Sequence, residues 1–333
     1  MTNDPVLEVK NLQTHFFTDD GVVKAVDDVS FSLRKGEVMG IVGESGSGKS
    51  VTNLSIMNLV QTPPGRIVGG EVLFHGEDIL RMKEKRIRLI RGAKISMIFQ
   101  DPMTSLNPFL RISTQMIETL RLHQKLSKKE AKERAIEMLT IAGIPAAKER
   151  IDNYPHQFSG GMCQRVMIAM GLSCNPEILI ADEPTSALDV TIQAQILDLM
   201  KNLTSQFGTA VILITHSLGV VAGMCDTIYV MYAGRIVERG PTADIFERPL
   251  HPYTRGLIKS VPRLDRPNSE RLFSIPGQPP NVIDLPPCCP FYPRCAEAME
   301  ICRTRYPEET GYGNSHYAAC WNQANAASPG GII

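Results

Sequence analysis

The most informative pattern in this chain is Gly43-Glu-Ser-Gly-Ser-Gly48-Lys49-Ser50. The apolar run before it, Glu37-Val-Met-Gly-Ile-Val42, is typical of a buried strand, and the residues from Val51 to Met57 have the pattern of a helix. A strand, a glycine-rich loop ending in Gly-Lys-Ser and a helix form an arrangement that cradles phosphate. Loop N–H groups close around the phosphate, and the helix N-terminus adds a positive field. A chance glycine turn is the alternative, and the flanking pattern argues against it.

The same stretch predicts which atoms bind the nucleotide. Lys49 is expected to reach the β- and γ-phosphates, and the Ser50 hydroxyl is expected to bind Mg²⁺. The predicted contacts from the loop and the start of its helix are Gly43, Glu44, Ser45, Gly46, Ser47, Gly48, Lys49, Ser50 and Val51.

Composition limits the classes of protein that fit. The chain has 333 residues, of which 43% are hydrophobic, and its 35 basic residues balance 35 acidic ones. This balance leaves no global field for nucleic acid or anionic lipid. No apolar run is long enough to span a bilayer, and the polar start Met1-Thr-Asn-Asp-Pro5 lacks the pattern of a secretory signal. We expect a soluble intracellular chain.

Strands and helices alternate along much of the sequence. The residues Leu7 to Leu12 and Ala25 to Leu33 alternate apolar and polar, which predicts antiparallel strands with one buried face. Apolar runs at Glu177 to Ala181 and Ala210 to Thr215 predict buried strands, and the segment from Thr191 to Phe207 between them predicts a helix. The pattern predicts an α/β sheet with its ligand at the carboxyl ends of the strands.

The middle of the chain departs from this alternation. Helices are predicted over Arg111 to Lys125 and over Ser127 to Ala142, the second with Glu130 positioned to complete a capping box. The basic stretch from Arg81 to Arg91 is interpreted as a solvated helix face, because no aromatic residues interleave as nucleic-acid binding would favour.

These changes in pattern predict the domain boundaries. A nucleotide-binding domain is expected over residues 1–250, with an inserted helical subdomain over about residues 103–165. From about His251 the sequence is Pro-rich and weakly periodic, which predicts a separate extension over residues 251–333.

Polar side chains lie at the carboxyl ends of three predicted strands, namely Glu177 to Ala181, Ala210 to Thr215 and a further strand over Lys94 to Gln100. Asp182 would hold Mg²⁺ directly or through water, and Glu183 beside it would be the general base for water attacking the γ-phosphate. His216 would donate to the γ-phosphate, and Gln100 would contact Mg²⁺ or the attacking water. Each could instead be a satisfied polar group at a strand end. The phosphate loop favours the catalytic interpretation of the first three, whereas spacing alone leaves both interpretations open for Gln100.

A second glycine-led segment, Phe158-Ser-Gly-Gly-Met162, opens a predicted helix. A helix N-terminus of this kind suits an anion, although a simple turn and cap would need no function. The chain has no second phosphate loop to pair with it.

In their order and spacing these motifs resemble those of the ATP-binding-cassette (ABC) ATPases over about residues 6–250. The matching segments are Gly43–Ser50 (Walker A loop), Gln100 (Q-loop), Phe158–Met162 with Gln164 and Arg165 (signature motif), Ile178–Glu183 (Walker B with the catalytic glutamate), Ser186–Asp189 (D-loop) and His216 (switch histidine). The resemblance implies a P-loop nucleotide-binding domain with a RecA-like core, an antiparallel β subdomain and a helical subdomain, followed by an irregular cysteine-rich extension.

The resemblance also implies a paired site for ATP and Mg²⁺. In the family two such domains sandwich two ATP molecules head to tail. Ser159, Gly160, Gly161 and Asp189 of one subunit would then face the nucleotide of the other. Phe16 falls where the family stacks an aromatic ring on adenine, with Phe17 as the nearby alternative.

Three further segments narrow the likeness to the subfamily that energises oligopeptide, dipeptide and nickel importers. They are Asp101-Pro-Met-Thr-Ser-Leu-Asn-Pro108, Tyr154-Pro-His-Gln-Phe-Ser-Gly-Gly-Met162 and His251-Pro-Tyr-Thr-Arg-Gly-Leu257. The segments Ile275-Pro-Gly277 and Cys289-Pro-Phe-Tyr-Pro-Arg-Cys295 extend the likeness to about residue 321. The implied partners are a second homologous ATPase, giving a heterodimer, two transmembrane permease subunits and an extracytoplasmic binding protein, without nucleic acid. The implied location is peripheral, on the cytoplasmic face of the inner (plasma) membrane.

Two positions depart from the family pattern. Met162 ends the signature where Gln or Glu is usual in the superfamily, and Ser217 follows the switch histidine where Asp is common. The second departure weakens hydrogen bonding on the D-loop side and leaves the catalytic set intact.

Five of the eight cysteines crowd the segment 288–320. Four thiolates suit tetrahedral Zn²⁺ or an iron–sulfur cluster, and in a reducing compartment metal binding is favoured over disulfides. The resemblance to peptide-importer ATPases implies a 4Fe–4S cluster, with zinc as the alternative. The predicted ligands are Cys289, Cys295, Cys302 and Cys320, with Cys288 as an alternate.

The sequence therefore predicts an ATP hydrolase that energises peptide import. A nickel-importer ATPase of the same subfamily is the first alternative. A soluble ABC ATPase acting on nucleic acid or ribosomes is a second, and the absence of a coiled-coil insertion argues against it. A non-hydrolytic regulatory nucleotide binder is a third, and Glu183 argues against that.

Overall fold

A computed structural model describes residues 4–186, 188–261, 273–283 and 285–323. The chain divides into two compact units. The first unit contains residues 4–6, 33–38 and 81–214, and the second contains residues 7–32, 39–80 and the described residues from 215 onward. In these residues no helix is both long enough and apolar enough to cross a membrane.

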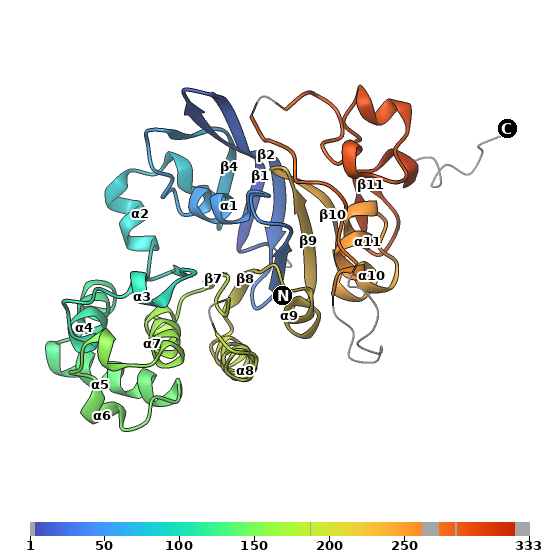
Figure 1. Cartoon of the computed structure of the whole chain (residues 1–333). Helices are drawn as coiled ribbons and strands as arrows, with labels where there is room; N and C mark the ends of the chain where they lie inside the picture. The colour runs from blue at the N-terminus through green and yellow to red at the C-terminus, as the bar shows by residue number, and fades with distance from the viewer. Residues whose placement is uncertain (1–3, 187, 262–272, 284, 324–333) are drawn as a thin grey trace. The chain divides into compact units, whose positions relative to one another are not determined.

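The first unit combines three parallel strands with most of the helices (Figure 1). Its strands, in the order β8-β7-β6, are Ala210–Ile214, Ile178–Asp182 and Ile95–Ile98. Its helices are α2 (Glu84–Ile90), α3 (Pro102–Ser105), α4 (Ile112–Gln124), α5 (Lys128–Ile141), α6 (Ala147–Arg150), α7 (Gly160–Leu172) and α8 (Val190–Phe207), with a 3-10 turn at Pro155–Gln157. The strands β7 and β8 are buried along their whole length, as their uninterrupted apolar sequences predict.

The helices of this unit pack in a chain of neighbours. Helix α4 packs on α5, α5 on α7, and α7 on both β6 and α8. The predicted capping box of α5 is confirmed: the Ser127 hydroxyl accepts from the Glu130 N–H at 3.3 Å, and the Glu130 carboxylate accepts from the Ser127 N–H at 2.9 Å. Helix α2 buries only Ile87, so its basic side chains form a solvated face as predicted.

The second unit contains two groups of strands. The antiparallel sheet β2-β1-β4-β5 is formed by Gly21–Leu33, Leu7–Thr18, Gly65–Phe74 and Glu77–Asp78. The other strands run in the order β11-β12-β10-β9-β3 and comprise Thr310–Gly311, Tyr317–Ala318, Arg235–Pro241, Thr227–Tyr232 and Val38–Val42. The helices are α1 (Lys49–Ile56), α9 (Leu218–Met224), α10 (Thr242–Glu247) and α11 (Pro252–Lys259), with 3-10 turns at Ile79–Arg81, Tyr292–Arg294 and Glu300–Arg303.

The residues beyond 250 are integrated into this second unit through Glu238 on β10. Its carboxylate is fully buried and accepts hydrogen bonds from the N–H groups of Leu250 and His251, each at 2.8 Å. The same carboxylate lies 2.8 Å from Nε2 of His316, just before β12. One buried acid thus fixes both the start of α11 and the strand that extends the sheet edge, because a buried carboxylate needs several partners.

His251 caps α11 and is itself buried. Its Nδ1 accepts a hydrogen bond from the Tyr253 N–H at 3.1 Å, so the cap requires a neutral ring. Burial lowers the pKa of His251 to about 4, against opposing attraction from Glu238. Protonation of Nδ1 would place an N–H group opposite the Tyr253 N–H, and the hydrogen bond would be lost.

This cap predicts an acid-sensitive second unit. Between pH 6.5 and about 4, His251 is protonated in the unfolded state but stays neutral in the folded state. The free energy of unfolding must therefore fall as the pH drops through this window. We expect a loss of up to about 3 kcal/mol in the free energy of unfolding, measured by urea denaturation at several pH values. His251→Asn is the control, because it keeps a side-chain acceptor for the Tyr253 N–H without a titrating ring. Equal acid sensitivity in both proteins would contradict the assignment.

Candidate functional site

The phosphate loop occupies the turn between β3 and α1 in the second unit, as the sequence predicts. Gly48 has a φ of 102°, and a Cβ there would lie 2.2 Å from the carbonyl oxygen of Ala25. The loop is held from outside by the Gly234 N–H, which donates to the Ser47 carbonyl at 2.9 Å. Backbone geometry and close packing therefore explain why glycine is needed at position 48.

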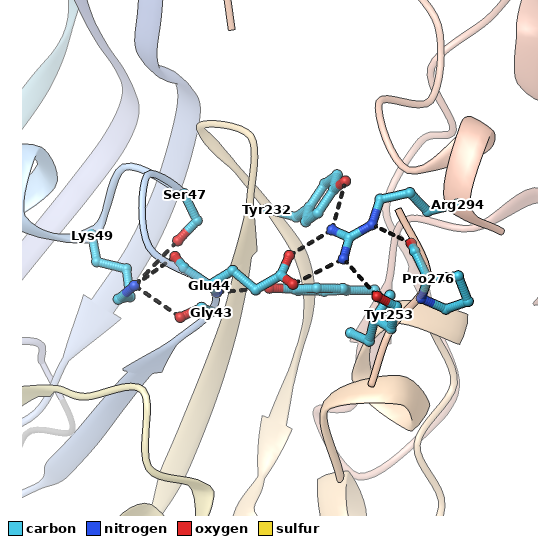
Figure 2. Close-up of polar contacts among 9 residues, drawn as sticks. Gly43, Glu44, Ser47, Lys49, Tyr232, Tyr253, Pro276 and Arg294 are labelled. Atoms are coloured by element: carbon cyan, nitrogen blue, oxygen red, sulfur yellow. Dashed lines mark hydrogen bonds and ion pairs between the residues drawn. The ribbon is translucent and has the colours of Figure 1, made fainter. Parts of the chain in front are cut away.

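Lys49 lies inside the loop, with only 6% of its surface exposed. Its Nζ donates to the carbonyl oxygens of Gly43 at 2.9 Å and Glu44 at 2.8 Å, and to the Ser47 hydroxyl at 3.4 Å (Figure 2). A buried ammonium needs such acceptors, and phosphate oxygens are stronger ones. The loop therefore presents a cation that can exchange carbonyl partners for an anion.

One loop residue has partners that the sequence analysis missed. The Glu44 carboxylate accepts hydrogen bonds from both terminal nitrogens of Arg294. The Glu44 N–H donates to the Tyr253 hydroxyl at 2.8 Å (Figure 2). The hydrogen bond to Glu44 raises the pKa of Arg294. Tyr253 and Arg294 both lie in segments that carry the subfamily resemblance, where the sequence gives no sign of a contact with the loop. No local pattern pairs residues about 250 positions apart, although a basic residue enclosed by prolines and cysteines was a visible oddity.

The predicted adenine-stacking position lies on β1. Phe16 is half-buried and pairs with Gly65 of β4 in the antiparallel register, whereas Phe17 is 50% exposed. The role of Phe16 in binding adenine stays a prediction.

The carboxylates predicted for catalysis lie at the carboxyl end of β7 in the first unit. Asp182 is buried as the last residue of the strand, and Glu183 follows it. Glu183 has a φ of 46°, an unusual backbone conformation for a residue with a side chain. It is fixed by its N–H, which donates to the Ile214 carbonyl at 2.9 Å, and by the Ser186 hydroxyl, which donates to its carbonyl at 3.2 Å. Strain held by the surrounding structure is common at functional sites.

Gln100 lies beside this strained glutamate. Its Nε2 donates to Oε2 of Glu183 at 3.2 Å, although the two residues are 83 positions apart. The structure thus places together two side chains that the sequence analysis assigned to the same chemistry. The contact places the Gln100 amide directly against the carboxylate that the sequence analysis assigned as the general base.

The signature glycines open α7, also in the first unit. The Ser159 hydroxyl caps this helix by accepting from the Met162 N–H at 3.3 Å. Ser159 and Gly160 are exposed, and a Cβ at Gly160 would meet no atom within 4 Å. A 13-residue helix therefore presents its positive N-terminal end at an open surface.

Two further predicted residues sit at element boundaries. Asp189 is exposed and caps α8, where its Oδ1 accepts from the Ile192 N–H at 3.0 Å; Ala187 of the same D-loop lies outside the described residues. His216 is exposed between β8 and α9, within the second unit. The predicted site residues are therefore divided between the two units. Lys49 and the rest of its loop belong to the second unit with His216, and the other catalytic and signature residues belong to the first.

The tail cysteines form a group of free thiols. Cys289 and Cys302 are buried, and the Cys289 N–H donates to the Cys302 carbonyl at 3.0 Å. Burial raises the pKa of Cys289 to about 12, and the neighbouring thiols Cys302, Cys320 and Cys295 add to the shift. Four predicted ligands thus lie within electrostatic range of one another, and a cation would offset the repulsion between their thiolates.

This grouping fits a metal in the chemistry of its donors, but the sulfur positions are not those of an assembled site. Over residues 4–186, 188–261, 273–283 and 285–323, no three His, Cys, Asp or Glu side chains are arranged to hold a metal ion. Cys288 is only partly exposed, and its N–H donates to the Pro286 carbonyl at 2.7 Å.

Comparison with known families matches both parts of the chain. Residues 26–186 match the ABC transporter family, and residues 237–302 match the C-terminal region of oligopeptide/dipeptide transporters. The first match contains the phosphate loop, Gln100 and Glu183, and the second contains Tyr253 and Arg294.

Curated relatives are similar over almost the whole chain. The chain is 54% identical over 316 residues to the oligopeptide transport ATP-binding protein OppD of Salmonella typhimurium, covering 95% of this chain and 93% of that protein. It is 53% identical over 324 residues to the dipeptide transport ATP-binding protein DppD of Bacillus subtilis, covering 97% and 96%.

Solved structures share the cassette fold. The chain is 28% identical to the ATP-binding cassette MJ0796, solved as a dimer in a post-hydrolysis state with ADP and Pi. The TM-score is 0.64, and the match covers 71% of this chain and 98% of that one. It is 29% identical to cbiO1 from Clostridium perfringens, part of the ABC transporter complex cbiONQ. That match has a TM-score of 0.62 and covers 74% and 92%.

The loop geometry predicts that adding one methyl group at position 48 severely weakens nucleotide binding. Gly48→Ala would place a Cβ 2.2 Å from a backbone oxygen, so the loop must move. We expect affinity for ATP·Mg²⁺ to fall by at least about tenfold, measured by equilibrium binding.

Gly36→Ala is the matched control for this change. Gly36 has a φ of 72°, and a Cβ there meets no atom within 4 Å, so only the conformational cost applies, about 1 kcal/mol of stability. Nucleotide binding by Gly48→Ala as tight as that by Gly36→Ala would contradict the analysis.

Proposed function

The chain belongs to the ABC transporter family, and from this premise we propose that it is the ATP-hydrolysing subunit that energises import of di- and oligopeptides through a membrane permease. The observation that carries the proposal is the identity above 50% to oligopeptide and dipeptide transport ATP-binding proteins. It extends over the cassette and the C-terminal region alike.

The phosphate loop is assigned to the β- and γ-phosphates of ATP. Lys49 exchanges its carbonyl acceptors for phosphate oxygens, which are charged and hold the ammonium more strongly. The Ser50 hydroxyl is assigned to Mg²⁺, with Asp182 and Gln100 as its further ligands. Phe16 is assigned to the adenine ring.

Glu183 is assigned as the general base. Hydrolysis needs a carboxylate near the attacking water to accept its proton, and the Gln100 amide donates to Oε2 of Glu183 at 3.2 Å at the carboxyl end of β7. The strained backbone at Glu183 supports this role because it fixes the direction of the side chain. His216, exposed beyond β8, is assigned to donate to the γ-phosphate.

The signature helix is assigned to the nucleotide of a second ATPase subunit. Its open, capped N-terminus at Ser159, Gly160 and Gly161 suits an anionic group, and Asp189 lies at another exposed helix start. The cassette MJ0796 was solved as a dimer. We assign a homologous partner, forming a heterodimer in which each subunit completes the site of the other.

The surface around Gln100 is assigned to the permease. The apolar side chains of Phe99, Met103, Phe109 and Leu110 are 43, 48, 86 and 37% exposed. Apolar side chains left in water in this way mark protein interaction sites. Two permease subunits and an extracytoplasmic binding protein complete the proposed importer, and this chain is peripheral on the cytoplasmic face of the membrane.

Replacing the general base tests the reaction and the transport role together. The chain is purified from membranes with the partners that bind it, and those partners are identified by mass spectrometry. We expect ATP hydrolysis that is stimulated by di- or oligopeptides with the binding protein present. Glu183→Gln should lower kcat by about a thousandfold while retaining ATP binding. Undiminished hydrolysis would refute the assigned base, and stimulation by Ni²⁺ instead of peptides would refute the substrate class.

The tail is proposed to hold a 4Fe–4S cluster on Cys289, Cys295, Cys302 and Cys320. The proposal rests on the four free thiols that lie within electrostatic range of one another. When bound, the cluster would supply cross-links between segments that are otherwise short and irregular. We assign it a structural role in bracing the tail.

Metal analysis of anaerobically purified protein tests the cluster. We expect iron and acid-labile sulfide in equal amounts and a broad visible absorbance band, all lost in Cys302→Ser. Cys288→Ser should keep them if Cys289 is the ligand of this adjacent pair. Pure protein that holds zinc and lacks both iron and the visible band would contradict the proposal.

A further inference from the structure

The Arg294 guanidinium is a buried cation pointed at the phosphate loop from the C-terminal region, a name that here covers the described residues from 251 onward. It ends the 3-10 turn Tyr292–Arg294, and its side chain is only 5% exposed. Nη1 donates to Oε2 of Glu44 at 2.6 Å and Nη2 to Oε1 at 2.9 Å, which is a bidentate ion pair. Nε donates to the Pro276 carbonyl at 2.9 Å. A planar guanidinium held at three nitrogens has one orientation, so it also fixes the carboxylate it binds (Figure 2).

Glu44 is held at its backbone as well as at its side chain. Its N–H donates at 2.8 Å to the hydroxyl of Tyr253, whose ring is fully buried. That ring packs against Tyr232 and Phe291, with centroids 4.6 and 5.5 Å away. The Tyr232 hydroxyl in turn accepts from Arg294 at 3.3 Å. Two residues of the C-terminal region, Tyr253 and Arg294, therefore bind the backbone N–H and the side-chain carboxylate of Glu44.

The same loop residue also contacts Lys49, the lysine assigned to the phosphates. The backbone carbonyl of Glu44, in the same residue as the held N–H and carboxylate, accepts from Lys49 Nζ at 2.8 Å. An unpaired carboxylate on this loop would repel the triphosphate, and a mobile one could compete for the Lys49 ammonium. Arg294 removes both effects by neutralising the carboxylate and fixing it away from the lysine (Figure 2).

We propose that Arg294 is a positioning residue for nucleotide binding that acts through Glu44. The C-terminal region is thereby a structural part of the ATP site. The inference rests on the proposed nucleotide site at Lys49 and goes beyond it, because a residue outside the cassette motifs sets the charge and shape of the loop.

The competing interpretation is that the Arg294–Glu44 ion pair only stabilises the packing of the C-terminal region on the rest of its unit. The ion pair Arg239–Glu309 offers a matched control for this interpretation. There Nε and Nη2 of Arg239 on β10 donate to the two carboxylate oxygens of Glu309 at 2.7 Å each. This pair has the same bidentate chemistry and also fastens the C-terminal region, but neither partner belongs to the phosphate loop.

Binding of ATP·Mg²⁺ and ADP·Mg²⁺ to the purified full chain separates the two interpretations. We expect Arg294→Gln to weaken ATP binding by about tenfold, and ADP binding less because ADP carries one charge fewer. The double variant Glu44→Gln with Arg294→Gln should return to within about threefold of the wild type, because no unpaired carboxylate remains. Arg239→Gln should leave both affinities unchanged. In steady-state hydrolysis Arg294→Gln should raise KM for ATP and leave kcat nearly constant.

Three outcomes overturn the inference: unchanged ATP affinity in Arg294→Gln, an equal loss in Arg239→Gln, or no rescue in the double variant. Thermal unfolding without nucleotide shows whether each variant is folded. Lys49→Ala separates this inference from the proposed site. If Lys49→Ala binds ATP normally, the proposed nucleotide site fails. If Lys49→Ala loses binding while Arg294→Gln keeps it, only the role of Arg294 fails.

Discussion

The need to satisfy a buried ammonium group governs the arrangement around the phosphate loop. Lys49 is almost wholly enclosed, so the loop must turn carbonyl oxygens inward to receive its Nζ. The loop also needs glycine at position 48, where φ is 102° and a Cβ would lie 2.2 Å from the Ala25 carbonyl oxygen. The result is a cradle ordered by its own hydrogen bonds, and preorganisation of this kind lowers the cost of binding an anion.

Sequence patterns predicted the features that depend on local interactions. The capping box of α5 and the buried strand β7 need only residues close together in the chain, so propensity and periodicity reveal them. The contact between Gln100 and Glu183 was within reach because parallel strands bring their carboxyl ends to one edge. The unusual φ of Glu183 was not, because backbone strain is imposed by surrounding contacts and leaves no pattern in the sequence.

The partners of Glu44 mark the limit of such prediction. The motif leaves the side chain at position 44 undetermined, since loops of this type bind phosphate through their backbone N–H groups. Arg294 reaches Glu44 only because the irregular segment before Cys295 folds back on β9 and α11 through Tyr232, Tyr253 and Phe291. Aromatic packing between segments without periodicity has no sequence signature, so the pair becomes visible only in three dimensions.

An acidic residue within a phosphate-binding loop is electrostatically unfavourable unless its charge is cancelled. Water screens the charge of Glu44 poorly, because its side chain is about three-quarters enclosed. The guanidinium of Arg294 donates to both carboxylate oxygens instead. The counter-charge comes from the C-terminal region, so this region and the loop must be correctly folded together for the loop to present a net positive face. Under the proposed assignment, any process that orders or loosens the turn carrying Arg294 would act on the charge of the proposed nucleotide site without touching the residues assigned to the chemistry.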